Sequence, residues 1–156
     1  MYLSPKFRRN LEVQGFACST TGFKAIEPWL RLNPSACLIL AVVGLAFKSP
    51  TVFLVMAAFA AFGAIFKHAP LDLVYNYGIR YLTHTPSLPV NPPPRRFACF
   101  IGFLWSLTIA WAFFTGSMTL AYTLAIVLIL VIIPMVAIHY CVASEIYQKI
   151  IGYRPK

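Results

Sequence analysis

The chain has 156 residues, of which 60% are hydrophobic and only 11% are charged, and it carries a formal net charge of +9. Its mean hydropathy is +0.75. This composition leaves too little polar surface to cover a soluble globule of this size, so we predict an integral membrane protein. Membrane topology and attraction to anionic lipid heads explain the excess of basic residues, and no motif for nucleic-acid binding accompanies it.

Residues 1–32 are expected to form an N-terminal segment outside the bilayer. They mix five basic residues with Glu12 and Glu27, and they contain no apolar stretch of the kind that a cleaved secretory signal needs. They hold too few apolar residues for a domain of their own. We therefore expect them to lie along the membrane or against a neighbouring protein.

A membrane domain is predicted over residues 33–148, and it opens with two apolar segments. These segments cover residues 33–48 and 50–67 and are separated by a short turn, so they predict one helical hairpin. At 1.5 Å per residue, each is only just long enough to cross a hydrocarbon core of about 30 Å.

Residues 70–84 are predicted to form an amphipathic helix that lies flat in the membrane interface. Pro70 suits the first position of a helix. Tyr75, Tyr77 and Tyr81 combine an apolar ring with a hydroxyl that prefers water, and Arg80 can reach the lipid head groups. A docking surface for a soluble partner is the alternative interpretation.

Residues 85–96 contain five prolines and are predicted to form a stiff, extended connector without a helix. A ligand for a proline-binding signalling domain is the alternative. Arg95 and Arg96, at the end of the connector, are expected to lie in the interface and to anchor the next span.

Two further apolar segments, residues 97–114 and 119–143, predict a second hairpin, followed by a short tail at 149–156. Pro134 removes a backbone donor and is expected to kink the last span. The predicted fold class is all-α: an integral membrane four-helix bundle of two helical hairpins, with an interfacial amphipathic helix between them.

The distribution of basic residues predicts the orientation. Twelve of the thirteen Lys and Arg residues fall on one side of the membrane if the four segments are spans, and only Lys48 falls on the other. The positive-inside rule places both termini in the cytoplasm. We therefore expect a multi-pass protein of the bacterial inner membrane.

Small residues recur at helical spacing in two of the spans and predict close helix packing. The packing residues expected are Ala57, Ala60, Ala61 and Ala64 in the second span, with Gly102, Ser106 and Ala110 in the third.

The spans hold no charged residue in their middles, which argues against a proton-coupled transporter. The sequence shows no phosphate loop, paired carboxylates or metal-ligand spacing, so we predict neither an autonomous enzyme nor a metal site.

Four cysteines, Cys18, Cys37, Cys99 and Cys141, are expected in the half of the protein that faces the cytoplasm, where thiols stay reduced. Cys37, Cys99 and Cys141 suit small packing positions at helix ends. The alternative is that Cys141, with Cys99, is a redox thiol activated by a nearby basic group.

His139 follows an apolar span and is the candidate ligand for a haem or chlorophyll. The alternative is a hydrogen-bonded histidine at the interface. We expect no other cofactor.

The arrangement of these segments is similar to that of a bacterial membrane family, the domain of unknown function four-three-nine-five. The resemblance rests on the first hairpin, the Tyr and Arg helix from Pro70 to Leu82, the proline-rich stretch, and the motifs Pro-Arg-Arg-Phe at 94–97 and Cys-x-x-Ser-Glu-x-Tyr at 141–147. It implies a small four-span membrane domain. Family members commonly carry a Cys-x-x-Cys-Glu-like element and occur beside thioredoxin-like or rhodanese-like proteins, which implies thiol or sulfur chemistry. Here Ser144 replaces the second cysteine, so a dithiol within this element is excluded.

Two functions are expected. The first is a non-catalytic accessory or scaffold subunit that packs against other subunits of a larger membrane complex, respiratory or photosynthetic. The alternative is a membrane component of thiol or sulfur redox chemistry that uses Cys141.

Overall fold

The computed structural model describes residues 5–16 and 23–152, and none of these residues lies in a strand. The helices are α1 (Pro5–Val13), α2 (Phe23–Leu30), α3 (Leu32–Ala46), α4 (Pro50–Ile65), α5 (Pro70–Val74), a π-helical turn η1 (Tyr75–Ile79), α6 (Arg80–Thr83), α7 (Pro93–Phe114), α8 (Met118–Ile138) and α9 (Val142–Ile151).

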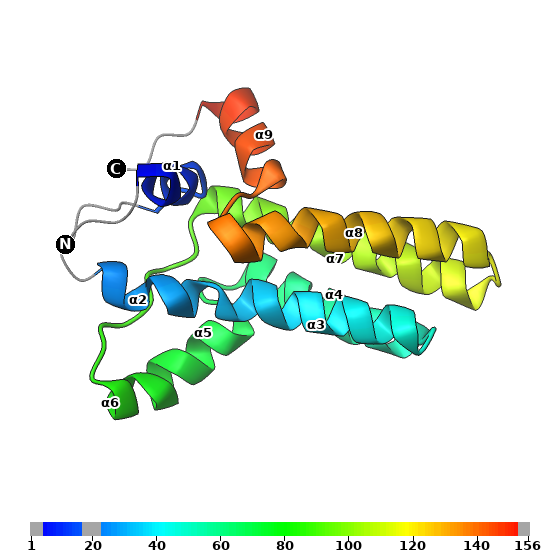
Figure 1. Ribbon diagram of the computed structural model, residues 1–156, viewed down its shortest axis with the longest axis horizontal. Coiled ribbons are helices and arrows are strands. Elements are labelled where there is room, and N and C mark those ends of the chain that lie inside the picture. Colours follow the sequence, from blue (N-terminus) through cyan, green and yellow to red (C-terminus); the bar gives the residue numbers. More distant parts are fainter. Residues whose placement is uncertain (1–4, 17–22, 153–156) are drawn as a thin grey trace.

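Four long helices lie side by side and form the bundle (Figure 1). Helix α3 packs against α4 and α8, and α7 packs against α4 and α8. The turns at 47–49 and 115–117 lie at one end of the bundle, which we call the hairpin end. The shorter helices α1, α5–α6 and α9 gather at the opposite end, which we call the broad end.

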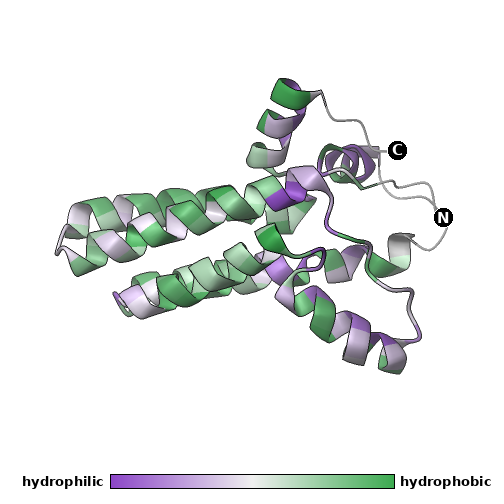
Figure 2. Cartoon of the chain, turned by 180° about the vertical axis from the view of Figure 1, so that it is seen from behind, coloured by the Kyte–Doolittle hydropathy of each residue, from purple (hydrophilic) through white to green (hydrophobic). Residues whose placement is uncertain are grey.

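Hydrophobic residues cover the bundle, whereas hydrophilic residues gather at the broad end (Figure 2). By length and composition, residues Ala25–Ala46, Pro93–Phe114 and Met118–Ile138 can each cross a membrane. The predicted all-α, multi-pass membrane fold is confirmed.

The second predicted span needs a correction, because α4 has only 16 residues and ends at Ile65. At 1.5 Å per residue its length is about 24 Å, which is less than the hydrocarbon thickness. Helix α4 is long and apolar enough to count as a fourth span only when it is taken together with Pro70–Thr83. The angle between these two helical segments is 71°. By length and composition, this part of the chain is therefore a broken span or a re-entrant loop, and the number of candidate spans among the described residues is three or four.

The last predicted span also ends earlier than expected, at Ile138 instead of residue 143. His139 adopts a left-handed conformation with φ of 54°, which stops the helix. The amides of Asn10 and Gln14 in and after α1 donate to the carbonyls of Ile138 and His139, at 2.7 and 2.6 Å. These bonds satisfy carbonyls that a helix end leaves without partners. Pro134 lies within α8 and does not end it.

Helix α7 starts at Pro93, inside the segment that was predicted to be an extended connector. Proline is well suited to the first positions of a helix because its missing N–H would have no partner there. The prediction of an extended chain as far as residue 96 is therefore wrong for residues 93–96, although Thr85–Pro92 contains no helix.

The broad end has a small apolar core of its own, formed by Leu11, Phe16, Ile26, Leu30, Tyr75 and Leu88. Tyr75 is fully buried; its ring lies 4.9 Å from that of Trp29, and its hydroxyl is bonded to Thr85 and the Pro86 carbonyl. The prediction that Tyr75 lies in the membrane interface is thus wrong. Its polar atom is satisfied by the connector, which lets the whole side chain leave water.

The small residues of α4 and α7 occupy different environments. Ala57, Ser106 and Ala110 are buried, while Ala60, Ala61 and Ala64 are partly buried. Gly102 faces open space, because a Cβ built on it would meet no atom within 4 Å. Close packing is therefore not the role of Gly102.

Candidate functional site

A cavity of about 290 Å³ lies between the long helices and extends from the broad end toward the middle of the bundle. Residues of α3, α4, α7, α8 and α9 line it, and nearly all of the lining is apolar. On α7 the lining residues include Arg95, Cys99, Gly102 and Trp105, which share one face because they recur at spacings of three and four.

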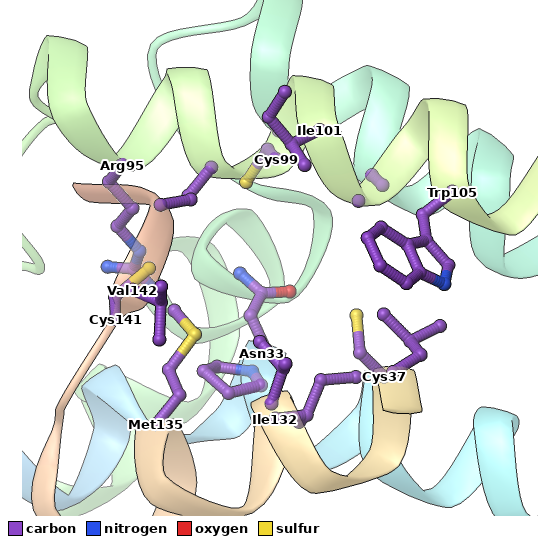
Figure 3. A pocket seen from close by; sticks show the side chains of 18 of the residues that line it. Asn33, Cys37, Arg95, Cys99, Ile101, Trp105, Ile132, Met135, Cys141 and Val142 are labelled. Atoms are coloured by element: carbon purple, nitrogen blue, oxygen red, sulfur yellow. The ribbon is translucent and has the colours of Figure 1, made fainter. Parts of the chain in front are cut away.

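Three cysteines from three parts of the chain contribute to this lining. Cys37 comes from α3, Cys99 from α7, and Cys141 from the break between α8 and α9 (Figure 3). All three are free thiols. The structure therefore brings together the three cysteines that the sequence places 42 or more residues apart.

Two of the thiols, Cys141 and Cys99, are held by different local features. Cys141 is buried and precedes α9 in an extended conformation, so the left-handed turn at His139 directs the chain back to the cavity. Cys99 packs on Gly63 of α4, where a Cβ would lie only 3.1 Å from its Sγ. A larger residue at 63 would push this thiol away from its position.

Arg95 supplies a positive charge to the same cavity. Its side chain is only 3% exposed. One terminal nitrogen donates to the Leu30 carbonyl at 3.3 Å, and the guanidinium lies over the ring of Phe16. The other nitrogen, Nη1, finds no hydrogen-bond partner among the described residues. An unpaired buried donor costs free energy, so this group is poised to bind an acceptor.

The prediction that Arg95 is an interfacial anchor is therefore wrong, because the chain folds it into the protein. Arg96 is different: its guanidinium donates to the carbonyls of Ala64 and Ile65 at 2.9 and 2.8 Å and so caps α4. Of the other residues expected at the interface, Tyr77 and Tyr81 are exposed, and Arg80 stacks on the Tyr81 ring.

A partly buried polar cluster lies at the end of α8. His139 Nε2 lies 2.6 Å from Glu27 Oε1 and 3.1 Å from Arg31 Nε, and Arg31 also pairs with Glu27 at 2.6 Å. Because these contacts engage Nε2, that nitrogen is committed to protein partners. His139 is not among the residues that line the cavity. The cluster joins α2 and Arg31, the residue before α3, to the end of α8.

Asn33 and Asp72 form a second polar contact at the rim of the cavity. Asn33 lines it and donates to Asp72 Oδ1 at 3.0 Å, and the Ala69 N–H donates to the other carboxylate oxygen at 3.3 Å. The carboxylate of Asp72 is therefore satisfied locally.

The family model described as "Domain of unknown function (DUF4395)" matches residues 27–151. The chain belongs to this family. The match includes every residue of the cavity, which begins at Asn33 and ends at Ile146. No curated protein and no solved structure matches the chain.

Sequence reasoning did not find the buried role of Arg95 or the shared cavity of the thiols. The motif Pro-Arg-Arg-Phe suggests two equivalent interfacial cations, but the two arginines point in different directions from a helix. The start of α7 at Pro93 is the signal that could have separated them, since it places Arg95 on the same helical face as Cys99.

Proposed function

We propose that this membrane protein carries out thiol chemistry, with Cys141 as the reacting residue and Arg95 as its electrostatic partner. The observation that supports this function is the convergence of three free thiols and one buried, partly unpaired guanidinium on a single cavity.

The positive charge of Arg95 favours thiolate anions in the cavity. Thiol exchange proceeds through a thiolate and releases a thiolate, so a fixed positive charge in a region of low dielectric attracts the anions on both sides of the reaction. Figure 3 places Arg95 and Cys141 on one side of the cavity, while Cys37 lies on the far side beside Trp105. Cys141 is therefore the first candidate nucleophile.

The proposed step is exchange with a small disulfide. The Cys141 thiolate attacks one sulfur of the disulfide, and a new bond forms between that sulfur and Cys141 Sγ. The original sulfur–sulfur bond breaks, and its electron pair leaves with the second sulfur, which takes up the proton that Cys141 lost. Cys141 is oxidised to a mixed disulfide, and one sulfur of the reagent is reduced to a thiol.

Cys99 provides a second thiol in the same cavity, on the α7 face that also carries Arg95. A thiolate in that position can attack the Cys141 sulfur of the mixed disulfide, which forms a Cys99–Cys141 disulfide, breaks the bond to the reagent and releases the reagent's sulfur as a second thiol. Gly63 keeps the Cys99 sulfur close to α4, so this second step would be sensitive to the size of residue 63.

The test is exchange with 2-hydroxyethyl disulfide in a Cys18→Ser background, followed by mass analysis of the intact protein and of its peptides. We expect the adduct on Cys141, with a rate that falls about tenfold or more in Arg95→Gln because the attraction between charges is lost. Cys37→Ser is the matched control and should retain the adduct. Equal modification of all three cysteines, or full exchange in Cys141→Ser, would refute the assignment.

The other function expected from the sequence, an accessory or scaffold subunit, remains a proposal with weaker support. Large apolar side chains such as Phe47, Trp111 and Phe114 are exposed on the bundle. Lipid satisfies such a surface as well as a protein subunit does, and aromatic residues are common at membrane interfaces. The cavity is the more specific feature.

A further inference from the structure

The cavity has an unusual distribution of polarity along its length. Its lining follows α7 from Arg95 to Trp105, which at 1.5 Å per residue is about 15 Å. Arg95 stands at one end, near the start of α7, and the lining toward the other end comes from residues such as Met56, Leu128 and Trp105. A ligand that matches it has one charged end and an elongated apolar body.

Within residues 5–16 and 23–152, no ion pair balances the charge of Arg95. None of the ion pairs among the described residues includes Arg95. Asp72, the buried carboxylate near the rim, accepts hydrogen bonds from Asn33 and the Ala69 N–H. A buried cation that has no carboxylate partner among the described residues, and whose Nη1 is unpaired there, is strongly stabilised by an anion. The head group that fits is therefore anionic.

The apolar part of the cavity has room for a chain. Gly102 lies on the lining face of α7, and a Cβ built there meets no atom within 4 Å. The helices that surround this part of the cavity, α3, α4, α7 and α8, are the apolar helices of the bundle (Figure 2), so the walls of the cavity suit a hydrocarbon chain. A water-soluble anion would leave most of this lining without contacts.

From this geometry we propose that the cavity binds a single-chain amphiphile with one anionic head group, of the fatty-acid type, with the head on Arg95 Nη1 and the chain directed toward Trp105. This goes beyond thiol chemistry, since it concerns what occupies the cavity and does not require a reactive cysteine.

The experiment compares dodecanoate with dodecanol, which has the same chain and no charge, by native mass spectrometry of the full chain in a neutral detergent. We expect dodecanoate to bind about tenfold more tightly than dodecanol, equal to about 1.4 kcal/mol. In Arg95→Gln this difference should fall below about threefold, while Arg80→Gln, at an arginine outside the cavity, should keep it. Equal binding of the two probes by the unmodified protein would overturn the proposal.

A second variant keeps the test independent of how well Arg95→Gln folds. Gly102→Leu places a side chain in the open part of the cavity and should abolish binding of both probes, whereas Ala58→Leu, at an exposed position of α4, should not. The binding assay contains no disulfide reagent, so a failure of ligand binding and a failure of thiol exchange are distinguishable. Unchanged dodecanoate binding in Gly102→Leu would contradict the proposed position of the chain.

The source of the ligand is identified by extracting the protein purified from its membrane and analysing the extract. A bound free carboxylate supports the proposal. A two-chain phospholipid in the extract, present in the same amount when the Arg95→Gln protein is extracted, would overturn it.

Discussion

His139 shows how the surroundings of one residue determine its chemistry. It lies between α8 and α9 and is 2% exposed. Burial lowers the pKa of His139 below its ordinary value, and the charges of Arg31 and Arg95 act in the same direction, while Glu27 opposes them. The imidazole of His139 therefore stays neutral at a lower pH than the imidazole of a free histidine does.

This shift predicts a pH dependence of stability. A histidine with a lowered pKa in the folded state takes up its proton more readily in the unfolded state, so stability falls as the pH drops below about 6.5. In detergent, the melting temperature should decrease between about pH 6.5 and pH 5. His139→Asn, which tolerates the left-handed backbone, should reduce this slope, whereas His84→Asn at an exposed position should not. An unchanged slope in His139→Asn would contradict the assignment.

For single residues, the sequence indicated which side chains could carry chemistry, but it did not predict which of them are buried. It singled out Cys141, Cys99 and His139, but it assigned Arg95 and Tyr75 to the membrane interface. Both carry an apolar stem and a polar end, a combination that suits an interface and also a buried position with a suitable acceptor. Only the fold supplies those acceptors, which are the carbonyls of Leu30 and Pro86.

At the scale of helices, close approach within the first hairpin depends on one glycine. A Cβ on Gly44 of α3 would lie 2.9 Å from Cε2 of Phe53 in α4. Phe53 is fully buried and stacked on Phe113, so it has little room to move. Gly102, in contrast, faces the open cavity.

The two glycines therefore make a matched pair. Gly44→Ala should destabilise the protein by about 1–3 kcal/mol through overpacking. Gly102→Ala should be neutral or should stabilise by up to about 1 kcal/mol, because alanine favours a helix. Thermal unfolding in detergent measures both. A more harmful effect of Gly102→Ala than of Gly44→Ala would contradict the described packing.

The end of α8 depends on side chains of the N-terminal segment. Gln14, which is buried, donates to the His139 carbonyl. Gln14→Leu should cost about 1–3 kcal/mol, because a buried carbonyl loses its partner. Ser87→Ala, at an exposed position, is the control and should have little effect on thermal unfolding. No loss of stability in Gln14→Leu would show that this carbonyl is satisfied in another way.

The presence of the long helices could be predicted from the sequence, because long apolar segments bounded by prolines and glycines leave few alternatives to a membrane helix. Helix ends were predicted less well. The end of α8 depends on contacts from residues that lie more than 120 positions away, and α9 is a separate helix for the same reason. Local patterns contain no information about such contacts.

At the scale of the whole molecule, the bundle separates an apolar body from a broad end that is rich in polar groups (Figure 2). The described ends of the chain, α1 and α9, both lie at the broad end, opposite the two hairpin turns (Figure 1). This arrangement fits an even number of crossings, for which the basic residues predict cytoplasmic termini.

That orientation can be tested with reporter fusions. A fluorescent protein that folds only in the cytoplasm should be active at both termini, and a periplasmic phosphatase should be active in the turn at 115–117. Phosphatase activity at either terminus would reverse the predicted topology.

The central claim is that the cavity is a site of thiol chemistry, and the state of its cysteines in the native membrane tests it most directly. Rapid acid quenching, alkylation and peptide mass analysis should find a fraction of Cys141 carrying a reducible sulfur adduct, while Cys37 remains a thiol. Fully reduced thiols at all three positions, under conditions that oxidise other cellular thiols, would contradict the claim.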